Sequence, residues 1–188
     1  MTEPLVRPEY GQPWTIEDLA RIPDDGFRYE IVDGSLLVSP MPAKPHWRVT
    51  HRLRRLLEAQ APGSLVVTGE NPGINISRGR SYRIPDIAVI HAAAIDGTQL
   101  GFEPEDFALV VEVLTPDNAG DDLVMKRHQY GKAGIPWYWI VSPRLRTLTV
   151  LAHDGDGSYV EEVVVGPGQT LRTENPYPIV IDPADFLD

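Results

Sequence analysis

Residues 107–117, FALVVEVLTPD, form the most hydrophobic run of the chain and indicate its fold class. Residues 107–114 lack the alternation of a half-exposed strand, which predicts a central strand covered on both faces. Glu112 is the one charged residue in those eight positions. A carboxylate buried without a partner is costly, so it becomes neutral, pairs with a cation or binds a metal ion. The run therefore predicts that residues distant in sequence meet Glu112.

The segments before this strand predict helices and a hairpin. Residues 15–23, TIEDLARIP, predict a short helix with Thr15 as its N-cap. Residues 27–40 predict a hairpin that turns at Asp33 and Gly34. Residues 45–63 predict the clearest helix, because an apolar stripe recurs at helical spacing between an initial proline and a final glycine.

The remaining segments predict strands and one further helix. Residues 118–134 predict a helix that ends at Gly134. Short strands are predicted at 64–70, 73–77, 85–91, 137–142, 147–153 and 159–165. This order predicts an α/β or α+β fold, with a mixed sheet flanked by helices.

The composition predicts one globular domain over residues 1–188, with a short helical segment at its N-terminus and an acidic tail at its C-terminus. Hydrophobic residues make up 42% of the chain, enough for a large core. The sequence has no cysteine, which excludes disulfides and thiolate metal sites. No apolar run is long enough to cross a membrane, and the first residues lack the order of a signal peptide. We therefore expect a cytoplasmic protein without membrane contacts.

Two acidic residues are candidate partners for Glu112. Asp86 follows Pro85 at the start of a predicted strand, near the end of the sheet where carboxylates from neighbouring strands meet. Taken alone, this position is more typical of a turn residue. Glu30 lies inside the short apolar stretch 29–31, where simple alternation would direct it to solvent.

Lys126 is the candidate cation. Asp122, Lys126 and Tyr130 are spaced by four residues and so share one face of the predicted helix. A solvent-exposed Asp–Lys pair has the same spacing. A helix that directly follows a strand usually packs on the same sheet, however, so this face could look toward Glu112.

These residues together predict a site for a hard cation. Mg²⁺ or Mn²⁺ prefers oxygen ligands. Such an ion can activate water for phosphodiester hydrolysis, and a lysine can neutralise the charge that develops on the phosphate. No organic cofactor is expected.

The order of these motifs resembles the PD-(D/E)xK restriction-endonuclease-like superfamily, and most closely the Uma-type endonucleases within it. The matching tracts run from about Trp14 to Leu151 and include YEIVDGSLLVSPMP, IPDIAVI, LVVEVLTPD and DDLVMKRHQYGKAGIPWYWIVSP. The resemblance implies a restriction-endonuclease-like mixed sheet with helices on both sides.

The resemblance also implies roles for single residues. Asp86 and Glu112 would hold the metal, with the backbone carbonyl of Val113 as a further ligand, and Glu30 would be an additional catalytic acid. The superfamily pattern places a lysine two residues after the glutamate, where this chain has Leu114. In this branch the lysine comes from the next helix, which points to Lys126.

Basic residues predict where a nucleic acid would bind, although the net charge of −10 argues against non-specific binding. Within the helix predicted from Pro45, Arg48, Arg52 and Arg55 share one face, and the resemblance places His46 near the site. A solvated helix face is an equal alternative. Three arginines between the strands could extend this surface: Arg78, Arg80 and Arg83.

The sequence therefore predicts a metal-dependent endonuclease that acts on DNA as a homodimer, for which the aromatic run 137–141 could supply an apolar interface. One alternative is a binding or assembly module that keeps the fold without catalysis. Another is an RNA nuclease or a different phosphoesterase.

Overall fold

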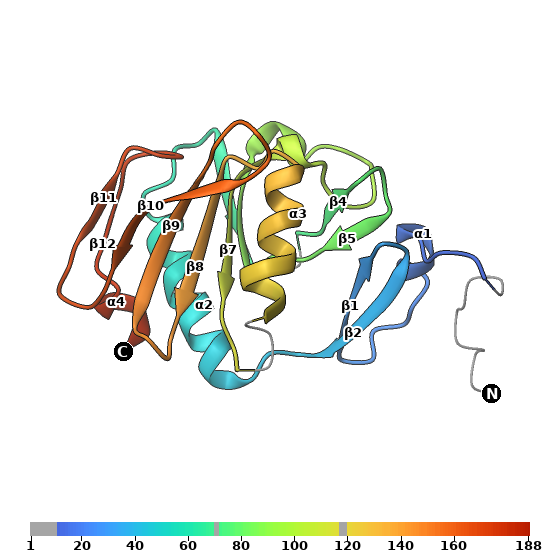
Figure 1. The fold of residues 1–188 in the computed structure, drawn as a ribbon, viewed down its shortest axis with the longest axis horizontal. Coiled ribbons are helices and arrows are strands. Elements are labelled where there is room, and N and C mark those ends of the chain that lie inside the picture. Colours follow the sequence, from blue (N-terminus) through green and yellow to red (C-terminus); the bar gives the residue numbers. More distant parts are fainter. Residues whose placement is uncertain (1–10, 70–71, 117–119) are drawn as a thin grey trace.

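The computed structural model describes residues 11–69, 72–116 and 120–188 (Figure 1). Its largest element is a six-stranded sheet in the order β10-β9-β8-β7-β6-β3. The strands are β3 (Leu65–Thr68), β6 (Ile87–His91), β7 (Phe107–Val113), β8 (Trp137–Ser142), β9 (Thr147–His153) and β10 (Tyr159–Val165). β7 and β8 are parallel and the other neighbours are antiparallel, so the predicted mixed sheet is confirmed.

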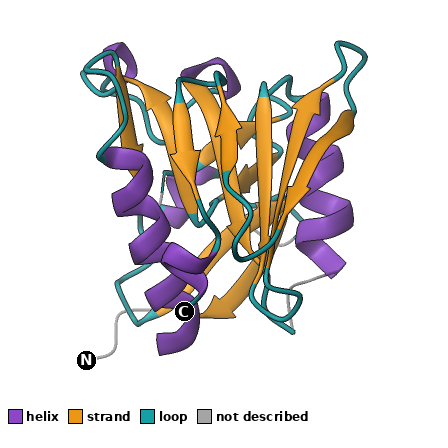
Figure 2. Cartoon of the chain, turned by 90° about the vertical axis from the view of Figure 1, so that its left-hand side faces the viewer, coloured by secondary structure: helices purple, strands orange, loops and turns teal. Residues whose placement is uncertain are grey.

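All seven residues of β7 are buried, as the absence of alternation predicted. The reason is that helices cover both faces of the sheet (Figure 2). Helix α2 (Lys44–Glu58) places Val49, Leu53 and Leu57 in the core on one face. Helix α3 (Arg127–Lys132) lies on the other face and buries Tyr130 there.

A second, smaller sheet has the order β2-β1-β5-β4. Its strands are β1 (Phe27–Val32), β2 (Ser35–Pro40), β4 (Ile74–Ile76) and β5 (Ser81–Arg83). The predicted hairpin is confirmed, and its turn residues Asp33 and Gly34 both have positive φ, as its turn type requires. The hairpin joins β5 rather than the large sheet, because β1 pairs with β5 through Ile31 and Tyr82. The sequence did not predict β5, because its three residues are too few to show the alternation of buried and exposed side chains that indicates a strand.

The helices differ from prediction mainly in their bounds. Helix α1 (Ile16–Leu19) begins at the predicted capping box of Thr15 and Asp18. Helix α2 ends at Glu58, several residues before Gly63. In the segment 118–134, of which residues 118 and 119 lie outside the described part of the chain, a π-helical stretch, Asp121–Lys126, precedes α3. Gly134 has a φ of 80° and follows the end of α3 as predicted.

The acidic C-terminal residues fold back onto the core. They follow a hairpin of β11 (Leu171–Thr173) and β12 (Ile179–Ile181) and form helix α4 (Ala184–Leu187). Phe186 is fully buried and belongs to the hydrophobic cluster that contains α2. The apolar side chains between the acids therefore decide the structure of this segment. No described helix has the length and hydrophobicity needed to cross a bilayer.

Candidate active site

The strand pairing brings Asp86 next to Glu112. β6 and β7 are antiparallel with Ile87 facing Val111, and continuing this register by one residue before the start of β6 sets Asp86 opposite Glu112. Residues that are opposite each other in antiparallel strands point to the same face of the sheet, with Cβ atoms about 5 Å apart. The pairing therefore brings together the two carboxylates that the sequence predicted as partners. Both side chains are buried.

Asp86 is held by three different elements. Its Oδ2 accepts hydrogen bonds from the backbone N–H of Val113 at 2.8 Å and from Nε2 of His46 at 2.9 Å, the latter with the ring nitrogen as donor. Its Oδ1 lies 3.2 Å from Nη1 of Arg28. Burial alone would raise the pKa of Asp86, but His46 and then Arg28 lower it well below its ordinary value. Asp86 is therefore ionised at neutral pH.

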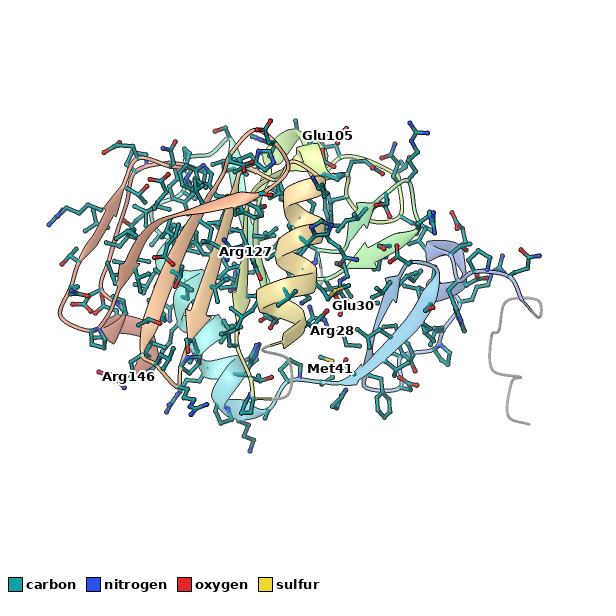
Figure 3. The ribbon with its side chains drawn as sticks, viewed as in Figure 1. Arg28, Glu30, Met41, Glu105, Arg127 and Arg146 are labelled. Atoms are coloured by element: carbon teal, nitrogen blue, oxygen red, sulfur yellow. The ribbon has the colours of Figure 1, made fainter. Side chains whose placement is uncertain are left out.

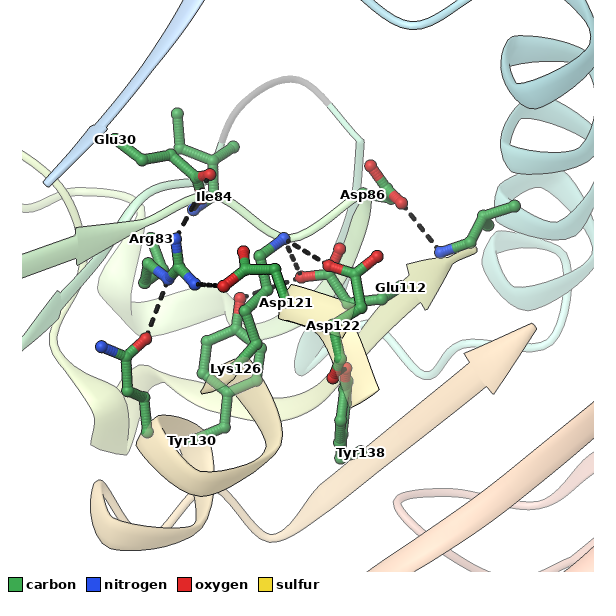
Figure 4. A network of polar contacts seen from close by, with 12 residues as sticks. Glu30, Arg83, Ile84, Asp86, Glu112, Asp121, Asp122, Lys126, Tyr130 and Tyr138 are labelled. Carbon is green, nitrogen blue, oxygen red and sulfur yellow. Dashed lines mark hydrogen bonds and ion pairs between the residues drawn. The ribbon is translucent and has the colours of Figure 1, made fainter. Parts of the chain in front are cut away.

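Glu112 is held from the helix side of the sheet (Figure 4). Its Oε1 accepts a hydrogen bond from the hydroxyl of Tyr130 at 2.9 Å and lies 2.9 Å from Nζ of Lys126. The same ammonium group lies 3.1 Å from Oδ1 of Asp122. Asp122, Lys126 and Tyr130, which the sequence placed on one helix face, thus all face the end of β7, and the solvent-exposed alternative for that face is excluded.

For Glu112 and Lys126, the effect of burial on the pKa opposes the effect of the neighbouring charges. Burial raises the pKa of Glu112 well above its ordinary value, against the lowering effect of Lys126. Burial also raises the pKa of Asp122. Burial would lower the pKa of Lys126, but the carboxylates of Glu112, Glu30 and Asp122 raise it above its ordinary value. Lys126 is therefore a charged lysine in a low-dielectric pocket.

Glu30 enters the network through another arginine. It is buried rather than directed to solvent, and its Oε1 accepts the backbone N–H of Ile84 at 2.7 Å. Its Oε2 lies 3.6 Å from Nη1 of Arg83, which is fully buried. Arg83 also binds Asp121 at 2.6 Å and Gln129 at 2.9 Å. Arg83 therefore links the small sheet to the helix that carries Lys126, and the prediction that it would contact nucleic acid is wrong.

Arg28 is the site residue that the sequence reasoning missed. Besides Asp86, it donates a hydrogen bond to the carbonyl of Ile84. Figure 3 shows Arg28 and Glu30 on the same side of the hairpin, toward the large sheet. The signal was present, because Arg28 and Glu30 are two residues apart and residues at that spacing share one face of a strand.

The side chains have the right chemistry for a divalent cation. Hard oxygen donors suit Mg²⁺ or Mn²⁺. Five acidic side chains meet three basic ones in this network; the acids are Glu30, Asp86, Glu112, Asp121 and Asp122, and the bases are Arg28, Arg83 and Lys126. The buried Oδ1 of Asp122 has no hydrogen-bond partner among the described residues, although Lys126 is near.

The side chains do not converge on a metal-binding geometry. Within the described ranges, no three Asp, Glu, His or Cys residues form a group that could hold a metal ion as they are placed. The carboxylates are instead occupied by Arg28, His46 and Lys126.

The basic residues of α2 are divided between the site and the surface. His46 lies against Asp86, as the resemblance implied for a near-site residue. Arg48 and Arg55 are exposed, and Arg52 is partly buried. The predicted interface at residues 137–141 is not available, because β8 lies between β7 and β9 and Tyr138 to Val141 are buried.

Comparisons with known proteins give the family and the fold of the chain. The family model Uma2, described as "Putative restriction endonuclease", matches residues 16–183. A crystal structure described as a putative nuclease of the DUF820 family, from Anabaena variabilis, superposes with a TM-score of 0.70. The alignment covers 93% of this chain and 98% of that chain at 18% identity, which shows a shared fold. No curated protein matches the sequence.

Proposed function

This chain belongs to the Uma2 family of putative restriction endonucleases, and on that premise we propose that it hydrolyses phosphodiester bonds in DNA with Mg²⁺ or Mn²⁺ as its cofactor. The observation that carries the proposal is the position of Lys126, whose Nζ lies 2.9 Å from Glu112. Leu114 occupies the position where the superfamily pattern has its lysine. Lys126, which follows β7 in the next helical segment, contacts Glu112 near the end of that strand instead.

We assign the metal to Asp86 and Glu112, with the backbone carbonyl of Val113 as a third ligand. A divalent ion bound there supplies an activated water and neutralises charge on the phosphate. The pairing of β6 with β7 fixes the two carboxylates on one face of a rigid sheet. His46 and Arg28 hold Asp86 in its ionised form.

Lys126 is the group we assign to the phosphate. It is charged, and the walls around it exclude water, so its attraction for a developing negative charge is stronger than in solution. Asp122 contacts Lys126 and the hydroxyl of Tyr130 donates a hydrogen bond to Glu112, and these contacts limit the movement of both groups. We assign a positioning role to Arg83, which ties the helix of Lys126 to the small sheet.

The test is cleavage of plasmid and oligonucleotide DNA by purified protein with Mg²⁺, with Mn²⁺ or with a chelator. We expect cleavage only with metal, and a loss of about 100-fold or more in each of Asp86→Asn, Glu112→Gln and Lys126→Met. Lys132→Met changes an exposed lysine of the same helix and serves as the matched control.

The same assay separates the alternatives. Cleavage that survives in both carboxylate variants contradicts the proposed site. Cleavage of RNA in preference to DNA would show that the protein is an RNA nuclease. Binding of DNA or of a protein without metal-dependent cleavage would indicate a binding or assembly module, for which the lack of converged ligands among the described residues is the supporting observation.

A further inference from the structure

A small pocket shares three residues with the candidate site, Arg28, His46 and Asp86. Its volume is about 140 Å³, and Arg28, Met41, His46, Trp47 and Asp86 are among its lining residues. Sites that enclose drug-sized ligands measure roughly 300–1,000 Å³. The pocket therefore has room for one planar ring and not for a whole nucleotide or a duplex.

Trp47 forms an exposed aromatic wall of this pocket. Its side chain is 62% exposed although it is large and apolar. One face of its ring stacks on His51, with ring centroids 4.8 Å apart and planes 11° from parallel. His51 lies one helical turn further along α2, so its ring supports one face of the indole, and no second ring among the described residues stacks on Trp47. Met41, 56% exposed, adds a flexible apolar side chain at the same pocket.

Cations flank this wall in an otherwise acidic protein. Lys44 and Arg48, on either side of Trp47 in α2, are both exposed. The net charge of the chain is −10, so such a local pair of cations suits an anionic ligand. Asp86, which we assign to the metal, is also among the residues that line the pocket. The pocket thus combines an aromatic side chain and a proposed metal ligand in its lining, with exposed cations nearby on the same helix.

We propose that this pocket binds a nucleobase of the substrate, stacked on Trp47, next to the phosphate that is cut. The proposal rests on the proposed nuclease function and specifies its substrate class. A base in a duplex is covered on both faces, so the nucleotide that enters is single-stranded or turned out of the helix. Stacking on one indole is tolerant of base identity. The chain therefore acts on unpaired or locally opened DNA.

A second copy of the chain is the competing occupant, because apolar side chains near the pocket are also exposed on the hairpin, Phe27 and Val38 among them. The supported ring of Trp47, the flanking cations and the contact with Asp86 favour a nucleotide. They would have no evident use in an apolar dimer interface.

The experiment measures binding without cleavage, in a chelator and at one fixed salt concentration. The probes are a labelled twelve-nucleotide oligothymidine, a twelve-unit abasic backbone of the same charge, and a duplex of equal length, followed by fluorescence anisotropy. Trp47→Ala is compared with the wild type, with Trp47→Phe, and with Leu145→Ala, which alters an exposed apolar residue, 71% exposed, in the turn between β8 and β9.

We expect Trp47→Ala to weaken oligothymidine binding by roughly 5- to 100-fold, the range that loss of one base–aromatic stack produces. Trp47→Phe should retain most of the affinity, and Leu145→Ala all of it. The wild type should bind the abasic backbone and the duplex more weakly than oligothymidine. Equal affinity of the wild type and Trp47→Ala for oligothymidine would overturn the inference, as would equal binding of the abasic backbone or no binding at all.

Sedimentation of the same proteins tests the competing occupant. A dimer that dissociates in Trp47→Ala while oligothymidine binding is unchanged also overturns the inference. Cleavage assays with Mn²⁺ keep the two proposals apart. If the wild type binds oligothymidine through Trp47 but never cuts DNA, the base-binding pocket is supported and the nuclease proposal is contradicted. If the wild type cuts DNA and Trp47→Ala binds oligothymidine normally, only the base-binding pocket is contradicted.

Discussion

Nζ of Lys126 lies 2.9 Å from Oε1 of Glu112, and the two side chains are only 5% and 1% exposed. Such a buried pair gains little over an apolar pair of the same size, because both charges lose their hydration. Removal of Lys126 alone is costly, because the buried carboxyl group of Glu112 then keeps only its hydrogen bond from Tyr130 and no cation.

We therefore expect Lys126→Met to lower the free energy of unfolding by about 3–5 kcal/mol in the absence of metal. The double variant Lys126→Met, Glu112→Leu should recover part of this loss, since only Asp122 is then left without its cation. Urea unfolding followed by circular dichroism measures both. Lys132→Met should change stability by less than about 0.5 kcal/mol, because its side chain is exposed. Additive effects of the two buried substitutions would show that the pair is not coupled.

Metal binding should be visible as stabilisation, independently of any cleavage. At a Mn²⁺ concentration about 100 times the dissociation constant, a ligand of the folded state adds about 2.7 kcal/mol. For a chain of this size, that corresponds to a rise in Tm of about 5–10 °C. Differential scanning fluorimetry should show this rise in the wild type and in Glu161→Gln, which alters an exposed acid of β10. A full rise in Asp86→Asn and Glu112→Gln would place the metal elsewhere.

Glu30 is predicted as a catalytic acid by the family resemblance, yet its contacts suggest that it holds the chain between β5 and β6. Glu30→Gln keeps an oxygen for the N–H of Ile84 but removes the charge facing Arg83. We expect a loss of about 1–3 kcal/mol in the free energy of unfolding. If the role is structural, the rise of Tm with Mn²⁺ stays at the wild-type value. If Glu30 belongs to the metal site, that rise is lost.

The central strand and the acid–acid–lysine set could be predicted from the sequence because each leaves a local signal. A run without alternation indicates burial on both faces, and a four-residue spacing puts Asp122, Lys126 and Tyr130 on one helix face. The pairing of Asp86 with Glu112 depends on the register of β6 against β7, and only the fold determines that register. The family resemblance pointed to this pair of carboxylates, which the spacing of residues along the chain alone could not do.

The arginines were harder to predict, because a buried and an exposed arginine look alike in sequence. Arg83 was expected on the surface and is fully buried, since Glu30, Asp121 and Gln129 surround it. Those partners come from β1 and from the helical segment 121–132, both distant in sequence from Arg83. Arg28 has a comparable place beside Asp86. The C-terminal segment was predicted as an acidic tail because of its acidic residues. Its apolar residues Phe186 and Leu187 instead bury α4 in the core.

The packing of the C-terminal hairpin on α2 should make the fold sensitive to high pH. The hydroxyl of Tyr177 donates a hydrogen bond to the carbonyl of Leu57 at 2.8 Å, and burial raises the pKa of this tyrosine from 10.0 to about 12. A raised pKa in the folded state means that the unfolded chain loses this proton first. The contribution to stability is therefore complete below pH 10 and is lost as the pH rises from 10 through 12.

Tyr177→Phe should separate these two effects. At pH 7 the variant should lose about 1–2 kcal/mol, because the carbonyl of Leu57 loses its donor. Between pH 10 and 12 the wild type should lose up to about 1.4 kcal/mol per pH unit through this one group, and the variant should lose correspondingly less. Urea unfolding at pH 8, 10 and 11 gives both slopes. Buried tyrosines elsewhere, such as Tyr159, contribute equally to both proteins, so the difference between the slopes isolates Tyr177. Identical slopes would mean that Tyr177 ionises as readily in the folded protein as in the unfolded chain, and that the hairpin does not shield it.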